Sequence, residues 1–283
     1  MTHRVFITAL AIGCAAGLSL PAHAQSGLRV ALDGTFAPHA MPSLSGGIEG
    51  FNVDMAELIA ERLGTTIQID AAQFSGLIPA MQAGTYDFLV APVTVSAERA
   101  ENMLFTEGFM DTNFSFVQMA GTEAGDTLEG YRGQTISVNK GSAYEEYLNK
   151  NAAEYDITVT GYGTATDAVE AVLTGRAFAS LAGSTVAAWA VQKNPRLELG
   201  AEIGTGLVWA LPFRKDDVEN RNKVDAVLEC LKTDGSLAAL SEKWFGVTPA
   251  EGSTIVTPVA GYGTPGFPGY EDTPHGVTCD FAS

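Results

Sequence analysis

The chain has 283 residues, 46% of them hydrophobic, and a formal net charge of −17 at pH 7. This length is enough for one large domain or two ordinary ones. An acidic chain repels phosphate backbones and anionic lipid, so we expect neither nucleic acid nor a membrane surface as a partner. After residue 24 the histidines are His39 and His275, and they belong to no Cys/His cluster. We therefore expect no metal site and no cofactor.

Residues 1–24 have the features of a secretory signal peptide. Arg4 supplies the positive start, residues 5–20 form an apolar run, and small residues precede a cleavage site after Ala24. A lipoprotein leader with Cys14 as the modified residue is an alternative, but Ala11 stands where a bulky aliphatic residue would be expected. We predict an exported protein that keeps 259 of the 283 residues, 24 having been removed.

Two cysteines, Cys230 and Cys279, remain after the leader. In an oxidising compartment an isolated pair most simply forms a disulfide. The bond would tie the C-terminal tail to a helix. It would close a loop of roughly 50 residues and contribute roughly 4 kcal/mol in the chain-entropy model.

Strand-like and helix-like runs alternate along the first part of the chain. The helix predicted from residue 52 carries apolar residues at helical spacing and ends at Gly64. Alternation of this kind is typical of parallel sheets covered by helices on both faces. The predicted elements are strands at 28–33, 66–71, 88–95 and 114–119, and helices at 52–63, 77–83 and from 96 onward.

A second set of elements follows the polar stretch 120–130. Ser142 and Glu145 have the spacing of a capping box, and Ser184 is expected to cap another helix. The two sets suggest two α/β lobes, and the Gly- and Pro-rich residues 247–283 suggest an irregular strap. The predicted elements are strands at 135–138, 157–160, 178–181 and 206–213, and helices at 167–174, 184–192, 218–233, 236–245 and from 142 onward.

The segment from Gly76 to Phe109 is the most informative about function. A buried strand leads to Thr94, and a helix that begins at Ser96 places Arg99 in its first turn. A helix start offers free N–H groups, and a guanidinium is a planar fork of donors that matches a carboxylate. The segment therefore predicts a site for a small carboxylic acid. In the alternative interpretation Ser96 is only a cap and Arg99 a solvated helix residue.

Other candidates follow predicted strands, where open α/β sheets bind ligands. Asp33 ends the first strand, and Phe36 and Phe74 lie in loops that follow strands, where two rings could sandwich a ligand. The alternative is that both rings belong to the ordinary core. Ser142 and Ala143 begin a helix whose N–H groups could face an anion or could be capped locally. We find no nucleotide-binding or nucleophile-elbow motif.

At this point the sequence resembles a known family. The segments DGTFAP, GFNVDMAELIAERLG, GQTISVNKGSAYEEYL and LKTDGSLAALSEKWFG occur in order between residues 28 and 246. They resemble family 3 periplasmic solute-binding proteins, the polar amino-acid receptors of ABC importers. The resemblance implies a type II periplasmic-binding-protein clamshell, in which each lobe is a mainly parallel sheet flanked by helices.

The resemblance also implies how the chain is divided. The chain would cross between lobes near 111–116 and 204–209. Lobe one would comprise 25–115 and 208–246, lobe two 116–207, and the strap 247–283. Such a receptor would be a periplasmic monomer that delivers a small carboxylate-bearing solute, an amino acid or related organic acid, to ABC transporter permease subunits.

Residue roles carry over by position from the same resemblance. Arg99, helped by Thr94, would hold the ligand carboxylate bidentately, and Asp33 would face a polar or cationic ligand end. Phe36 and Phe74 would flank the side chain, and Ser142 and Ala143 would add contacts from lobe two.

Two departures from the family pattern matter. Ala91 and Pro92 stand where small hydroxyl residues are usual, and Pro92 has no N–H to donate. Gly183 stands where an acid usually pairs with the ligand's α-ammonium. Either a nearby carboxylate replaces that acid, or the ligand is not an ordinary α-amino acid.

An enzyme on the same scaffold is the rival hypothesis, because the family resembles exported dehydratases that act on cyclohexadienyl acids. Such an enzyme would need a general acid, and Asp33 or Glu145 are the candidates. A ligand-sensing domain presented to a membrane partner is a third hypothesis.

Overall fold

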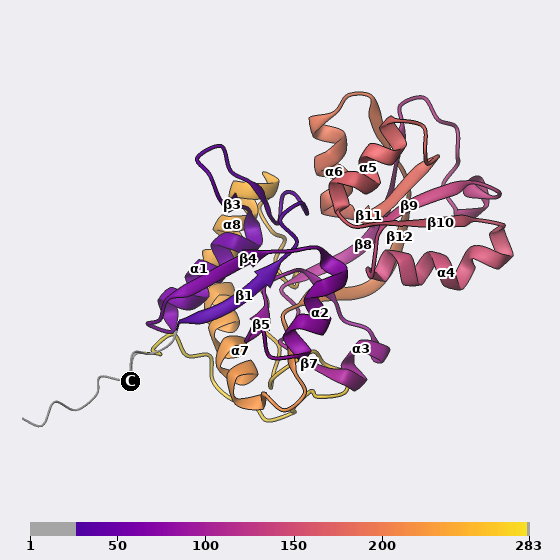
Figure 1. The fold of residues 1–283 in the computed structure, drawn as a ribbon. Coiled ribbons are helices and arrows are strands. Elements are labelled where there is room, and N and C mark those ends of the chain that lie inside the picture. Colours follow the sequence, from indigo (N-terminus) through magenta and orange to yellow (C-terminus); the bar gives the residue numbers. More distant parts are fainter. Residues whose placement is uncertain (1–26, 282–283) are drawn as a thin grey trace, which may run out of the picture.

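The computed structural model describes residues 27–281, so the predicted leader, with Cys14 and the cleavage site after Ala24, lies outside the described residues. Two lobes lie side by side, each built on its own sheet with helices packed around it (Figure 1). We call the five-stranded sheet and its helices lobe one, and the six-stranded sheet and its helices lobe two. Within the described residues, no helix is both long and apolar enough to span a bilayer.

Lobe one has the strand order β4-β1-β5-β13-β7. Strand β1 is parallel to β4 and β5, whereas β13 runs antiparallel to β5 and β7. Its strands are β1 (Leu28–Leu32), β4 (Ile67–Ala71), β5 (Phe88–Leu89), β7 (Met103–Phe105) and β13 (Pro212–Arg214), beside the hairpin β2 (Met41–Pro42) and β3 (Ile48–Glu49). Its helices are α1 (Phe51–Arg62), α2 (Phe74–Gln82), α3 (Ala97–Asn102), α7 (Val218–Thr233) and α8 (Ser236–Phe245).

Lobe two has the strand order β10-β9-β11-β8-β12-β6. Strands β10, β9 and β11 are parallel, and β8, β12 and β6 are joined to them by antiparallel pairings. Its strands are β6 (Val93–Thr94), β8 (Met110–Met119), β9 (Thr135–Asn139), β10 (Thr158–Tyr162), β11 (Ala179–Gly183) and β12 (Leu197–Ala210). Its helices are α4 (Ala143–Tyr155), α5 (Ala165–Leu173), α6 (Ser184–Lys193) and the short 3-10 turn η1 (Leu128–Tyr131).

The long strands β8 and β12 connect the lobes and pair with each other along much of their length (Figure 1). Both sequence-predicted crossings, at 111–116 and 204–209, lie within these strands. The expected two-lobed α/β fold is therefore confirmed. The sheets, however, are mixed and not mainly parallel as expected, because β13 in lobe one and the connecting strands β8 and β12 in lobe two run antiparallel to their neighbours. The division of the chain at 115/116 and 207/208 stays a proposal, since both positions lie inside paired strands.

Four local predictions were wrong. The strand expected at 206–213 is the end of β12 followed by β13, and these two strands join different sheets. The strand expected at 88–95 is two short strands, because Pro92 lacks an N–H for a central ladder, and β5 and β6 join different sheets. Phe74 is not in a loop but begins α2, where its burial offsets the low helix propensity of Gly76. Ser184 does not cap α6: Gly183 is the N-cap, and the Ser184 hydroxyl binds that of Ser115 at 2.7 Å.

The C-terminal tail is irregular and lies against α7, as the strap prediction expects. Buried side chains of α7 hold its backbone: Asp225 accepts from Gly263 N, and Lys232 Nζ donates to Thr257 O at 3.1 Å. The predicted disulfide is confirmed between Cys230 and Cys279, which are 49 residues apart. The tail is thus fixed to lobe one by a covalent bond and by buried polar contacts.

We predict that loss of the disulfide destabilises the protein by about 4 kcal/mol, because the unfolded chain regains the freedom of the closed loop. Urea unfolding of residues 25–283, with and without dithiothreitol, measures this loss. The variant Cys279→Ser serves as control, since the reductant should not change its unfolding midpoint. Equal midpoints for the oxidised and reduced protein would contradict the prediction.

Candidate ligand-binding site between the lobes

Both lobes contribute to one cavity, and it contains nine of the ten sequence-predicted site residues. Two further lining residues, Asn139 and Tyr144, were not predicted as site residues. Asn139 is the last residue of β9, and Tyr144 lies in the first turn of α4. The lining residues are Asp33, Phe36, Phe74, Ala91, Pro92, Thr94, Arg99, Asn139, Ser142, Ala143 and Tyr144.

The cavity is nearly closed in this conformation. The space that the centre of a water molecule can reach is about 10 Å³, which is roughly the room of one water. Hydrogen bonds join the lobes around it: Asn139 Nδ2 donates to Asp33 Oδ2 at 2.9 Å, and Ala165 N donates to Thr35 Oγ1 at 3.2 Å. A solute larger than water therefore needs the lobes to separate or the lining side chains to move.

Arg99 is buried, with 7% of its surface exposed, and its guanidinium reaches from α3 of lobe one to acceptors in lobe two. Nη1 donates to Thr94 O at 3.2 Å. Nη2 donates to Gly141 O at 3.1 Å and to the Glu146 carboxylate at 2.7 Å. Since α3 has only six residues, the guanidinium rather than the helix start supplies the positive charge of the cavity.

Two of the three predicted serine caps, Ser96 and Ser142, place these groups. Ser96 Oγ accepts from Arg99 N at 3.3 Å, and Ser142 Oγ accepts from Glu145 N at 3.2 Å. The Glu145 carboxylate accepts from Gly141 N at 2.7 Å, so it stabilises the turn before α4, and it does not line the cavity. The first turns of α3 and α4 thus face each other across the lobes.

Asp33 is the buried anion of the cavity, with 3% of its surface exposed. Its Oδ1 accepts from Thr35 N at 2.9 Å and Thr35 Oγ1 at 2.7 Å, and its Oδ2 accepts from Asn139. All three donors are neutral. None of the ion pairs found in residues 27–281 includes Asp33. A buried carboxylate without a positive partner is costly, so the cavity is suited to a cationic group.

Asn139 adds an unused acceptor beside this carboxylate. The residue is 4% exposed, and its buried Oδ1 has no hydrogen-bond partner in the part of the chain that the structure describes. The amide orientation is set by Asp33, because Oδ2 of Asp33 can accept only from the NH2 end of the amide. The pair therefore offers carboxylate and amide oxygens to N–H donors.

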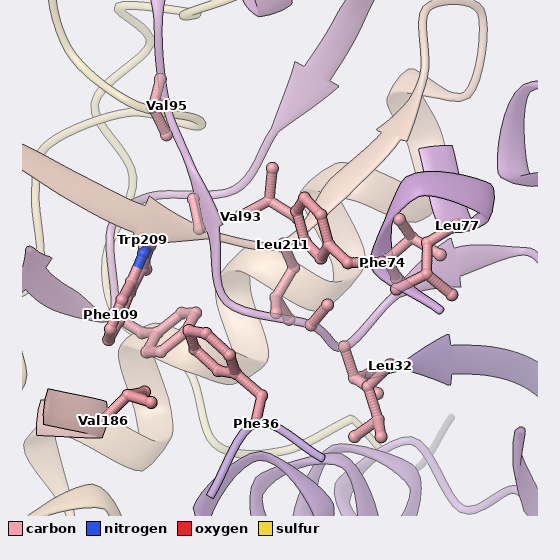
Figure 2. Close-up of a cluster of buried hydrophobic side chains, with 14 of the residues drawn as sticks. Leu32, Phe36, Phe74, Leu77, Val93, Val95, Phe109, Val186, Trp209 and Leu211 are labelled. Carbon is pink, nitrogen blue, oxygen red and sulfur yellow. The ribbon is translucent and has the colours of Figure 1, made fainter. Parts of the chain in front are cut away.

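Gly183 is the predicted residue that the structure does not bring to the cavity. A Cβ added at Gly183 would lie 2.5 Å from the Trp209 ring and 2.8 Å from Tyr144 Oη. Trp209 is itself fixed by donation from Nε1 to Thr94 Oγ1 at 3.2 Å. In Figure 2, Phe36, Phe109 and Trp209 gather near Val186 of α6. Aromatic side chains thus fill the space in front of position 183.

His39 was also missed by sequence reasoning, which considered it only as a metal ligand. Its Nδ1 lies 2.9 Å from Asn52 Oδ1, and its Nε2 lies 2.8 Å from Thr185 Oγ1 in lobe two. Asn52 Nδ2 donates to Val90 O, so Nδ1 carries the proton and Nε2 accepts. Burial lowers the pKa of His39 to about 4, and the neutral ring packs against Trp209 at 4.9 Å between centroids.

The fold and the interlobe cavity define a two-lobed solute-binding protein. The model of bacterial extracellular solute-binding proteins, family 3, matches residues 28–247, so the chain belongs to that family. It is 26% identical to the L-cystine-binding protein of Escherichia coli over 249 residues, covering 84% of this chain and 93% of that one. It is 24% identical to the L-arginine-binding protein of Pseudomonas aeruginosa over 239 residues, covering 81% and 92%.

Solved structures agree. An ancestral arginine-binding protein bound to arginine is 29% identical, with a TM-score of 0.76, and the match covers 79% of this chain and all of that one. The ancestral amino acid-binding protein described as a precursor of cyclohexadienyl dehydratase is 25% identical, with a TM-score of 0.72, and covers 77% of this chain and 95% of its own. The expected family and fold are therefore confirmed.

We predict that His39 makes folding stability depend on pH in weakly acidic solution. Its pKa falls from 6.5 in the unfolded chain to about 4 in the folded one, so the folded state binds fewer protons between these values. The contribution of His39 to the free energy of unfolding is therefore fully present above pH 6.5 and decreases as the pH falls toward 4. Between pH 7 and pH 5 this decrease is about 2 kcal/mol. Urea unfolding at both pH values measures it.

The matched variant is His39→Gln, which cannot titrate there. Between pH 7 and pH 5, the free energy of unfolding of His39→Gln should fall by about 2 kcal/mol less than that of the parent protein. Parallel pH dependences for the two proteins would show that His39 does not carry the effect.

Proposed function

We propose that this chain is the exported receptor of an ABC importer that closes on a small amino acid. The ligand carboxylate pairs with Arg99, and a cationic N–H group of the ligand pairs with Asp33 and Asn139. One observation carries the proposal: the interlobe cavity holds a buried guanidinium together with a buried carboxylate that has no positive partner among residues 27–281. A zwitterionic solute complements both charges.

The aromatic lining supports a ligand with an organic body between its charged ends. Phe36 and Phe74 are both largely buried, and both line the cavity. Aromatic faces bind apolar groups and also attract cations. Related proteins whose names include amino acids such as arginine and cystine support the same class of ligand.

The location and partners belong to this proposal. The leader would be cleaved after Ala24 and the remaining chain released into the periplasm as a monomer. Lobes divided at 115/116 and 207/208 would close on the ligand, and the closed form would deliver it to the permease subunits. The ATP-binding subunit would be a separate chain, since we find no nucleotide motif in this sequence.

The dehydratase alternative is less well supported. A general acid must donate a proton to the substrate, whereas both oxygens of Asp33 already accept hydrogen bonds. Glu145, the other candidate, is engaged by Gly141 N and does not line the cavity. The cavity geometry therefore favours binding over catalysis.

We predict that Arg99→Ala lowers affinity for the preferred amino acid by on the order of 30- to 1,000-fold, since a charge-assisted pair with the ligand carboxylate is lost. A thermal-shift screen of the twenty amino acids identifies the ligand, and calorimetry measures both proteins. Arg176→Ala, an exposed arginine of lobe two, is the control and should bind normally. Unchanged affinity in Arg99→Ala would place the carboxylate elsewhere.

We predict that Asp33→Asn weakens binding of the same ligand by on the order of 30-fold or more, because the buried cationic group loses its counter-charge. Asp126→Asn, in an exposed loop, removes the same charge and should have no effect. The contrary outcome is that the preferred ligand proves to be uncharged or anionic and that Asp33→Asn binds it as tightly as the parent protein does. The cationic part of the proposal would then be rejected.

A further inference from the structure

We propose that Glu146 competes with the ligand carboxylate for Arg99 and holds the unliganded lobes together. This inference rests on the proposed function of Arg99 and adds a residue that limits ligand affinity. Glu146 lies on α4 in lobe two, Arg99 lies on α3 in lobe one, and their charged atoms are 2.7 Å apart. The contact therefore forms only when the lobes approach each other.

The donor count of the guanidinium makes the competition specific. An arginine has two edges that can hold a carboxylate through two parallel N–H bonds, Nε with Nη2 and Nη1 with Nη2. Both edges need a hydrogen of Nη2. Its two hydrogens are taken by Gly141 O and by Glu146. A bidentate grip on a ligand thus requires one of these two acceptors to leave.

Glu146 is the acceptor that can leave. Gly141 O belongs to the backbone of the turn before α4, and the neighbouring N–H of that turn is held by Glu145. The Glu146 side chain is 37% exposed, whereas that of Arg99 is 7% exposed. Glu146 also lines a groove outside the cavity, so it can turn toward solvent without crossing the ligand's space.

A second partner for the displaced carboxylate stands on the same helix. Lys150 is four residues after Glu146 within α4, and both line the outer groove. A Glu followed by a Lys at this spacing is the favourable order for a helical ion pair. Glu146 therefore has two alternatives, Arg99 across the lobes or Lys150 along its own helix. Ligand binding would shift it from the first to the second.

The first experiment uses protein without any ligand. Glu146→Gln should open the unliganded lobes, which small-angle scattering detects as a larger radius of gyration. Glu154→Gln removes the same charge from an exposed position of α4 and should leave the radius unchanged. An unliganded radius that is the same in Glu146→Gln and the parent protein would overturn the latch.

The second experiment measures affinity with the best amino-acid binder of the thermal-shift screen. Glu146→Gln should bind it about 2- to 5-fold more tightly, the range expected when a partly exposed ion pair no longer competes. Lys150→Gln should bind it more weakly, because Glu146 loses its alternative partner. If Glu146→Gln bound more weakly, Glu146 would orient Arg99 for the ligand and the competition would be rejected.

Failure of this inference and failure of the proposed function give different results. If no amino acid bound the parent protein, the proposed function would fail, while the scattering experiment would still decide whether Glu146 holds the lobes. If Arg99→Ala lost binding but Glu146→Gln changed neither radius nor affinity, the receptor function would stand and the latch would not.

Discussion

The supply of N–H donors on one buried guanidinium limits what this cavity can do. Arg99, on α3 of lobe one, joins the lobes by donating to Thr94 O, Gly141 O and Glu146, which all belong to lobe two. The contacts through which Arg99 joins the lobes therefore use donors that a ligand carboxylate would also need. If the proposed competition holds, a solute would replace an internal acceptor of Arg99, and the measured affinity would reflect the difference between the two interactions.

Charge balance explains why the other side of the cavity behaves differently. Arg99 already has an anionic partner, whereas Asp33 is surrounded by neutral donors and by the unused oxygen of Asn139. Bringing a cation to Asp33 adds a charge partner without displacing one, because the donors of Thr35 and Asn139 can remain in place. Selectivity is thus expected to reside more in the cationic group of the ligand than in its carboxylate, which most competing metabolites share.

The sequence was most informative where local chemistry decides the structure. Serine caps, the alternation of strands and helices, and the position of Arg99 are set by neighbours a few residues away. Nine of ten site predictions accordingly lie around one cavity. The failures depend on distant partners. Gly183 was judged by its missing side chain, but Trp209 and Tyr144 fill that space from other elements.

Long-range contacts also explain the residues that sequence reasoning overlooked. Asn139 ends a strand like many others, and only its approach to Asp33, 106 residues away, gives it a role. The sequence pattern indicates that Glu146 is an ordinary solvent-exposed helix residue. Only the closed arrangement of the lobes places Arg99 beside it. His39 gains its neutral state from complete burial between Asn52 and Thr185, which no local pattern encodes. Their partners depend on the lobe arrangement, so these contacts are a property of the closed fold.

Trp209 shows how the connecting strands take part in this arrangement. It lies on β12, one of the two strands that cross between lobes, and it is 1% exposed. Its ring packs against Phe36 at 6.0 Å and His39 at 4.9 Å between centroids, and its Nε1 donates to Thr94. A rotation of the lobes about β8 and β12 would change the surroundings of this ring, because its partners come from both sides of the connection. One of the two connecting strands therefore carries a side chain whose packing depends on the relative position of the lobes.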